Sequence, residues 1–235
     1  MSTFDPTIYD AFGSRWWSGT SRWLRTLHNL VPARFTYFDR EVPDWRGKAV
    51  LDVGCGGGFM AEALAQRGAG VIGVDPSHEA IEAARAHAGA QGLAIDYRVG
   101  VGESLPVETG SIDIVVCVDV LEHVDDLDQV VSEVRRVLRP GGLFLFDTIN
   151  ATALARLCVV FFAERLLRLL PRGTHDPAKF IPPAVLRSKL GASGFACRPF
   201  VGLGPRGINR RFDPTFGRYP TLSVLYLGSA VLPGG

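Results

Sequence analysis

Short apolar runs alternate with stretches of helical character through the middle of the chain. The apolar runs have the length of buried β-strands and lie at residues 49–53, 70–74, 94–99, 112–118 and 143–146. The stretches between them are alanine-rich or amphipathic and lie at residues 59–65, 77–91 and 127–138. Because strands that alternate with helices form βαβ units, this order predicts an α/β fold with a mostly parallel sheet.

Both ends of the chain depart from this alternation. Residues 1–47 hold all four tryptophans and predict helices that precede the sheet, while residues 151–181 form an apolar, arginine-containing helix and a loop. Beyond this insertion the pattern predicts a helix and two strands, at residues 183–193, 195–201 and 222–228. Because no linker interrupts the chain, we expect one domain over residues 1–235, built on a seven-stranded sheet with 1–47 as a helical cap.

Composition narrows the class of protein. The chain has 235 residues, of which 47% are hydrophobic, and its net charge of +1 excludes proteins that act through a strong global field. No basic cluster accompanies an aromatic platform, so a nucleic-acid partner is not expected. The longest uncharged apolar stretch near the insertion, residues 157–163, is far shorter than the about 20 residues that span a bilayer. With no secretory signal and no Cys-x-x-Cys pair among four cysteines, we expect a cytoplasmic protein.

A glycine-rich segment, Asp52 to Gly58, follows the first predicted strand. Glycines at such a turn let a ligand approach the backbone, although strand–helix packing alone also selects them. Asp52 would repel the pyrophosphate of a dinucleotide, and it would attract the amino group of S-adenosylmethionine (SAM). Asp75 ends the second strand, where a carboxylate can hold both ribose hydroxyls. The pattern favours a SAM site; an NAD(P) site and a helix N-cap role for Asp75 remain the alternatives.

Several motifs resemble those of class I SAM-dependent methyltransferases. They are residues 51–58, 73–75, 112–116, 121–124 and 138–142. Further segments resemble one family, the ubiquinone-biosynthesis O-methyltransferases that act on polyprenyl phenols and catechols, and these are residues 14–17, 27–34, 86–88, 170–176 and 179–181. The resemblance covers nearly the whole chain and thins after about residue 200. It implies the Rossmann-like class I methyltransferase fold and SAM as the co-substrate.

The resemblance also implies which residues bind the cofactor. Arg34 would contact the SAM carboxylate, with a surface arginine as the alternative. Gly54 and Gly56 would line the methionine part, Asp75 would hold the ribose, and Val118 stands where the family has methionine. The acid that many methyltransferases place near the adenine is absent here. The full set of expected cofactor-binding residues is Arg34, Asp52, Gly54, Gly56, Asp75, Pro76, Gly102, Glu103 and Val118.

Three side chains that suit acid–base or metal chemistry follow the fourth strand. Asp119, Glu122 and His123 lie at the carboxyl edge of the sheet, where open α/β sheets bind ligands. We expect them to be catalytic, with His123 as base or orienting group for a phenol. In the family the matching glutamate, glutamate and histidine are associated with Mg²⁺, and here the first is shortened to Asp119. The alternative is that Glu122 and His123 only shape the pocket.

The insertion suggests a second kind of contact. Residues 151–172 predict a helix that is apolar on most faces and carries arginines at helical spacing. Such a helix can lie in a membrane interface, which suits a substrate with a lipid tail, or it can pack over the sheet. His175 and Asp176 follow in a loop that is expected to be a lid.

The sequence thus predicts a SAM-dependent O-methyltransferase that acts on a phenolic or polyprenyl-phenol acceptor. It could instead act on a secondary-metabolite phenol or a hydroxyquinone. A non-catalytic SAM-binding or lipid-interface protein is the alternative from another class. Oligomeric state is left open by the sequence.

Overall fold

The computed structural model describes residues 13–166 and 174–234. Its central sheet has the strand order β3-β2-β1-β4-β5-β9-β7-β8, and the short strand β6 pairs with β9 outside this path. The first five strands are parallel, and β9 is antiparallel to β5. Their bounds are β1 Ala49–Val53, β2 Gly70–Asp75, β3 Ile95–Val99, β4 Ile112–Cys117 and β5 Leu138–Ile149. The predicted α/β class with a parallel sheet is confirmed.

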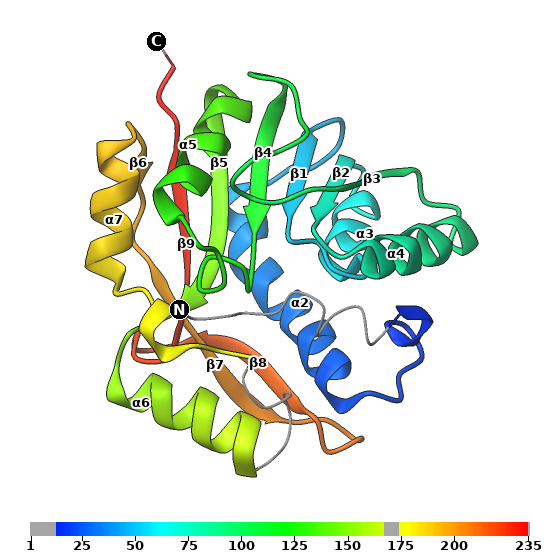
Figure 1. The fold of residues 1–235 in the computed structure, drawn as a ribbon, viewed down its shortest axis with the longest axis vertical. Coiled ribbons are helices and arrows are strands. Elements are labelled where there is room, and N and C mark those ends of the chain that lie inside the picture. Colours follow the sequence, from blue (N-terminus) through cyan, green and yellow to red (C-terminus); the bar gives the residue numbers. More distant parts are fainter. Residues whose placement is uncertain (1–12, 167–173, 235) are drawn as a thin grey trace.

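Helices cover the two faces of this sheet (Figure 1). Residues of α2 (Arg22–Glu41), α3 (Phe59–Ala65) and α4 (His78–Ala90) share one apolar core with one face of the strands. Residues of α5 (Leu127–Val137) and α7 (Pro183–Ala192) share a second core with the opposite face. Neighbouring residues of one strand divide between the cores, as Val50 and Leu51 do, because successive side chains of a strand point to opposite faces.

The predicted helical cap consists of a 3-10 turn, η1 (Gly13–Arg15), and the long helix α2. Ser21 is the N-cap of α2, and its side chain accepts a hydrogen bond from the backbone N–H of Leu24. The first twelve residues of the predicted cap lie outside the described residues. The helix α2 runs behind the sheet and extends past the carboxyl ends of its strands (Figure 1), and Arg34 is one of its buried residues.

The carboxyl-terminal part differs from the prediction. The described residues form nine strands, two more than the seven expected. The predicted strand at residues 195–201 is divided into the short β6 (Ala196–Cys197) and the start of β7 (Val201–Ile208). A further strand, β8 (Pro214–Tyr219), pairs with β7 as a hairpin, and β9 spans Leu225–Val231. The hairpin was missed because its glycines, prolines and arginines do not alternate with apolar residues as a half-buried strand does.

The insertion after β5 begins as a helix at the lower end of the molecule in Figure 1. It comprises α6 (Ala153–Arg156), which continues without a break into a π-helical segment, η2 (Leu157–Leu166). Residues 167–173, which include part of the predicted interfacial helix, lie outside the described residues. A 3-10 turn, η3 (Pro177–Lys179), follows them. No helix of the described residues is long and apolar enough to cross a membrane.

Candidate active site

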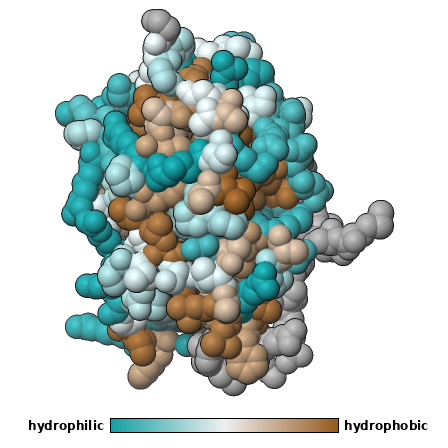
Figure 2. All heavy atoms as spheres, turned by 90° about the vertical axis from the view of Figure 1, so that its left-hand side faces the viewer, coloured by the Kyte–Doolittle hydropathy of each residue, from teal (hydrophilic) through white to brown (hydrophobic). Residues whose placement is uncertain are grey.

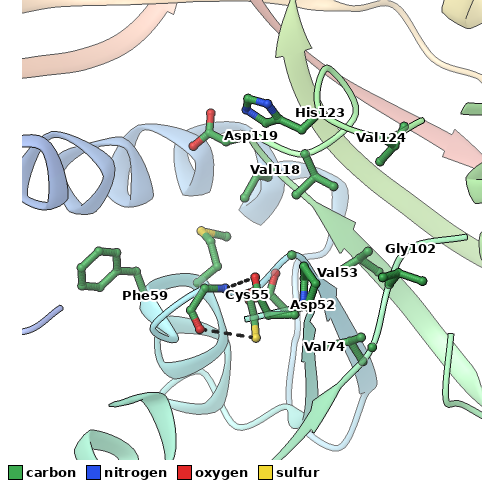
Figure 3. Close-up of a pocket in the computed structure, with 18 of the residues that line it drawn as sticks. Asp52, Val53, Cys55, Phe59, Val74, Gly102, Val118, Asp119, His123 and Val124 are labelled. Carbon is green, nitrogen blue, oxygen red and sulfur yellow. Dashed lines mark hydrogen bonds between the residues drawn. The ribbon is translucent and has the colours of Figure 1, made fainter. Parts of the chain in front are cut away.

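A pocket opens at the carboxyl edge of the sheet, against α2 (Figure 3). Its walls come from the glycine loop after β1, the end of β2, the segment at residues 100–103, and the segment at 118–125 that follows β4. The nine residues expected to bind the cofactor all line it: Arg34, Asp52, Gly54, Gly56, Asp75, Pro76, Gly102, Glu103 and Val118. Asp119 and His123 also line the pocket, whereas Glu122 does not. Residues far apart in sequence thus share one cavity.

Backbone N–H groups of the glycine loop anchor it to the end of β2. Gly54 donates a hydrogen bond of 2.7 Å to the carbonyl of Val74, and Gly56 donates one of 2.8 Å to the Asp75 carboxylate. Both glycines have positive φ, at 71° and 50°. Above the loop lies Trp16, so close that a Cβ on Gly56 would come within 2.8 Å of its ring. The cap therefore covers the loop, and glycine is required for that close approach.

Asp75 is fixed by two backbone groups. One carboxylate oxygen accepts the N–H of Gly56, and the other accepts the N–H of Ser77 at 2.9 Å. The N-cap of α4 is Ser77, whose side chain accepts a hydrogen bond from Ala80. The alternative interpretation of Asp75 as the N-cap is therefore wrong. Its role toward a ribose stays a prediction.

Asp52 is fully buried at the base of the pocket. Neither of its carboxylate oxygens has a hydrogen-bond partner among the described residues. Burial raises the pKa of Asp52 to about 8, against the opposing charge of Arg34 and with a contribution from nearby Asp75. A buried carboxylate without a partner is costly, so this position favours a cation that enters from the pocket.

Arg34 is buried between two carboxylates. Its Nε donates to Asp147 Oδ2 at 2.6 Å, and its Nη2 lies 2.5 Å from Asp119 Oδ2. Burial alone would lower the pKa of Arg34, but the charges of Asp119 and Asp147 outweigh it and raise that pKa. The guanidinium is therefore permanently charged at the wall of the pocket. It is not the surface arginine of the alternative interpretation.

The segment after β4 separates its three predicted catalytic residues. Asp119 turns toward Arg34, and its φ of 55° is left-handed. Glu122 is buried behind the pocket wall, where one of its oxygens accepts a 2.7 Å hydrogen bond from Thr148. Burial, followed by the charge of Asp119, raises the pKa of Glu122 to about 8. Only Asp119 and His123 therefore face the cavity (Figure 3).

His123 is neutral at physiological pH. Burial lowers its pKa to about 3, with further contributions from His175 and Lys179. The predicted lid loop reaches it directly: the ring centroids of His123 and His175 are 5.1 Å apart, and Lys179 Nζ donates to the His123 carbonyl at 3.1 Å. Lys179 also pairs with Asp125 at 2.7 Å. The loop is thereby joined to the segment after β4.

The predicted metal ligands Asp119, Glu122 and His123 do not converge. One donor atom from each of Glu122, His123 and His175 lies within 4.8 Å of the others, but Asp119 is absent from this group. One carboxylate and two imidazoles suit a borderline transition ion, whereas Mg²⁺ prefers oxygen ligands. The arrangement therefore does not fit the expected magnesium site, because Asp119 is paired with Arg34 instead.

At the other end of the pocket, Gly102 and Glu103 border the space expected for the adenine. Gly102 packs on Val130, which a Cβ would approach to 3.3 Å. Glu103 accepts a hydrogen bond from the backbone N–H of Asp125 at 3.1 Å and so joins this segment to the one after β4. A ligand that lies between residues 100–103 and the segment after β4 would contact both segments.

Sequence reasoning missed Asp147. This residue is 1% exposed, lies on β5, and contacts both Arg34 and the backbone of Asp119. The sequence contained a signal for it, because a carboxylate among the apolar residues of β5 needs a partner when it is buried. The neighbouring Thr148 donates a hydrogen bond to Glu122, and Asn150 donates one to the Leu222 carbonyl.

Comparisons with known proteins agree with this architecture. Residues 51–146 match the family model described as a methyltransferase domain. A ubiquinone biosynthesis O-methyltransferase from Azotobacter vinelandii is 40% identical over 205 residues, covering 87% of this chain and 88% of that protein. One from Chromobacterium violaceum is 38% identical over 217 residues, covering 91% and 93%.

A solved structure gives the same result for the fold. A SAM-dependent methyltransferase from Thermotoga maritima superimposes with a TM-score of 0.66 at 18% identity, covering 95% of this chain and 99% of that one. At this identity the likeness shows the fold, which is that of SAM-dependent methyltransferases.

Proposed function

Because the chain belongs to the family of ubiquinone biosynthesis O-methyltransferases, we propose that it methylates a phenol or catechol oxygen of a polyprenylated ubiquinone precursor. SAM is its co-substrate, as the methyltransferase domain and fold establish. The chain is an O-methyltransferase of the ubiquinone pathway, which excludes the non-catalytic SAM-binding protein considered above. The acceptor's tail and the roles of individual residues are the finer part of the proposal.

The observation that carries the assignment of the SAM site is the charge pattern of one pocket. Asp52 is a buried carboxylate without a hydrogen-bond partner in the described chain, and Arg34 is a buried cation in the same wall. A zwitterionic amino acid matches both, with its ammonium toward Asp52 and its carboxylate toward Arg34. Asp75 at the end of β2 would accept the ribose hydroxyls, and Gly102 and Glu103 would border the adenine.

At the acceptor end we assign His123 an orienting role. As a neutral imidazole it can accept a hydrogen bond from the phenol and hold its oxygen in line with the sulfonium carbon. As the new O–CH₃ bond forms and the S–CH₃ bond breaks, the phenol proton becomes strongly acidic. A weak base in contact with it, His123 or Asp119, can then take that proton.

Glu122 acts behind this pair. Its carboxylate accepts a hydrogen bond from Thr148, which keeps it behind the wall and out of the cavity. Asp119, Glu122 and His123 do not converge on one point as Mg²⁺ ligands would. The proposed methyl and proton transfers therefore use only protein groups. Thus Asp119 and His123, and not Glu122, are the proposed contacts with the acceptor.

The protein would reach the lipid tail of the acceptor by binding to a membrane surface. Leu154, Leu157 and Phe161 on α6 and η2 are each nearly half exposed, at 48%, 46% and 47%. Hydrophobic residues gather at this lower end of the molecule in Figure 2. Arg156 is exposed on the same helix, and two further arginines of the predicted interfacial helix, at positions 168 and 172, lie outside the described residues.

The tip of the β7–β8 hairpin adds a second exposed apolar pair. Ile208 is 70% exposed and Phe212 is 78% exposed. Exposed arginines flank them, at positions 206, 210, 211 and 218. Apolar side chains beside arginines suit an anionic bilayer surface, which supports peripheral contact by both segments.

The acceptor proposal is tested by comparing kcat/KM for a catechol with a short isoprenoid tail and for its tail-free parent. We expect the tailed catechol to be preferred by at least about tenfold, since each buried CH₂ contributes about 0.8 kcal/mol. Methylation of the tail-free phenol alone would contradict the proposal and favour a secondary-metabolite acceptor.

A further inference from the structure

Asp147 holds Arg34 and Asp119 together. Its Oδ2 accepts the Arg34 Nε–H at 2.6 Å, and its Oδ1 accepts the backbone N–H of Asp119 at 2.8 Å. All three groups lie at the pocket, yet Asp147 is 113 positions from Arg34 in sequence. One buried carboxylate thus fixes both the guanidinium and the left-handed backbone of Asp119, whose φ is 55°.

The two carboxylates on Arg34 are not equivalent. The Asp147 side chain is 1% exposed and makes an aligned hydrogen bond, whereas the Asp119 side chain is 29% exposed and lines the pocket. Asp119 Oδ2 lies 2.5 Å from Arg34 Nη2 at the wall of the cavity. A carboxylate that enters the cavity can therefore reach the same nitrogen, whereas Asp147 is enclosed and cannot be reached.

We propose that Asp119 occupies, in the ligand-free protein, the place on Arg34 that the SAM carboxylate takes when SAM binds, while Asp147 holds the guanidinium in position throughout. The inference rests on the proposed SAM site. A third carboxylate on the same guanidinium would bring like charges into contact, so the entering group displaces Asp119. Asp147 stays because it is enclosed and satisfied twice. It is a positioning residue, and Asp119 is an internal competitor of the co-substrate.

Two ligands that differ in one group test the exchange. SAM and decarboxylated SAM share the nucleoside, sulfonium and amino group, and only SAM has the carboxylate. The ratio of their dissociation constants, measured by calorimetry without acceptor, reports the carboxylate contact alone. Effects of a substitution on folding or on the rest of the site change both constants and cancel in the ratio.

The variants are expected to change this ratio in opposite directions. Asp119→Asn removes the competing charge and should raise the preference for SAM about fivefold, which is the upper end of what a solvent-accessible ion pair contributes. Asparagine tolerates a positive φ, so the backbone of residue 119 is retained. Asp147→Asn loosens Arg34 and should lower the preference at least about tenfold, as for a lost hydrogen bond to a charged group.

Asp113→Asn is the matched control. Asp113 is also on the sheet, is 26% exposed and pairs with Arg139 at 2.7 Å, but it does not line the pocket. Its ratio should equal that of the wild type. An unchanged or lower ratio in Asp119→Asn overturns the exchange, even if Asp147→Asn proves unable to fold.

The outcomes separate this inference from the function on which it rests. If the wild type binds neither ligand, the proposed SAM site itself fails. If it binds both and prefers SAM, but Asp119→Asn does not increase that preference, the site stands and the exchange fails.

Discussion

The side chain of Val120 packs directly against the backbone of Gly54. A Cβ at residue 54 would lie 2.1 Å from Val120 Cγ2, and Gly54 has a φ of 71°. The contact joins the glycine loop after β1 to the segment after β4 that carries Asp119 and His123. The walls that we propose for SAM and for the acceptor therefore share one packed boundary.

Replacing Gly54 with alanine should disturb both ends of the site. Gly54→Ala adds a positive-φ penalty of about 1–2 kcal/mol and an overpacking penalty of about 1–3 kcal/mol, and it should abolish measurable SAM binding. Gly47→Ala is the control, since Gly47 has a φ of 69° with nothing within 4 Å of an added Cβ. Thermal unfolding and SAM titration measure the effects. Equal losses in the two variants would contradict the steric account.

Binding of SAM should release a proton from Asp52. In the ligand-free protein its pKa is raised to about 8, so it is mostly protonated at about pH 6.5, and the ammonium of SAM favours the carboxylate. Affinity should therefore rise with pH toward 8, by at most about tenfold per unit. The number of protons released on binding is measured by calorimetry of SAM binding in buffers that differ in ionisation enthalpy.

The controls are Asp52→Asn, which cannot release this proton, and Asp96→Asn, at an exposed pair with Arg98. Proton release should vanish in the first and persist in the second. Binding by the wild type without any release would show that Asp52 does not hold the ammonium.

Removing the His123 imidazole should affect transfer and not co-substrate binding. For His123→Ala we expect kcat to fall by roughly 100-fold, the scale of a lost acid–base or positioning group. The dissociation constant of SAM should change less than about twofold, because the proposal places His123 beside the acceptor and not beside SAM. His78→Ala, at the exposed start of α4, serves as the control. A SAM affinity that falls in parallel with kcat would assign His123 to the cofactor.

Acidic residues on the insertion should weaken binding to anionic vesicles. Leu157→Asp with Phe161→Asp places two charges on the proposed interface and should reduce co-sedimentation with phosphatidylglycerol vesicles at least about tenfold. SAM binding should be unchanged. The control is Val185→Asp, because Val185 is 43% exposed on α7. Vesicle binding that the double variant leaves intact would reject contact through this segment.

The parts of the site that are local in sequence could be predicted. Asp52, Gly54 and Gly56 follow from one strand–turn–helix segment, and Asp75 follows from the end of the next strand. The position of each depends on a few neighbouring residues. The parallel pairing of β1 with β2 then brings the ends of the two strands side by side. The α/β fold could be predicted for the same reason.

The electrostatic partners could not be predicted, because they depend on packing between distant elements. Arg34 meets Asp147 only because α2 packs behind the sheet and brings residues of distant segments together. Asp119 was expected beside Glu122 and His123 from its sequence position, yet a left-handed backbone turns it toward Arg34. The hairpin of β7 and β8 lacked the alternation that identifies strands.

Transfer of an isotopically labelled methyl group tests the central claim most directly. The purified protein would be incubated with SAM carrying a ¹³C methyl group and a catechol with a short isoprenoid tail, and the products analysed by NMR and mass spectrometry. The account predicts one labelled methyl group on a phenolic oxygen and an equal amount of S-adenosylhomocysteine. Bound SAM with no labelled ether on any phenol or catechol, tailed or tail-free, would contradict it.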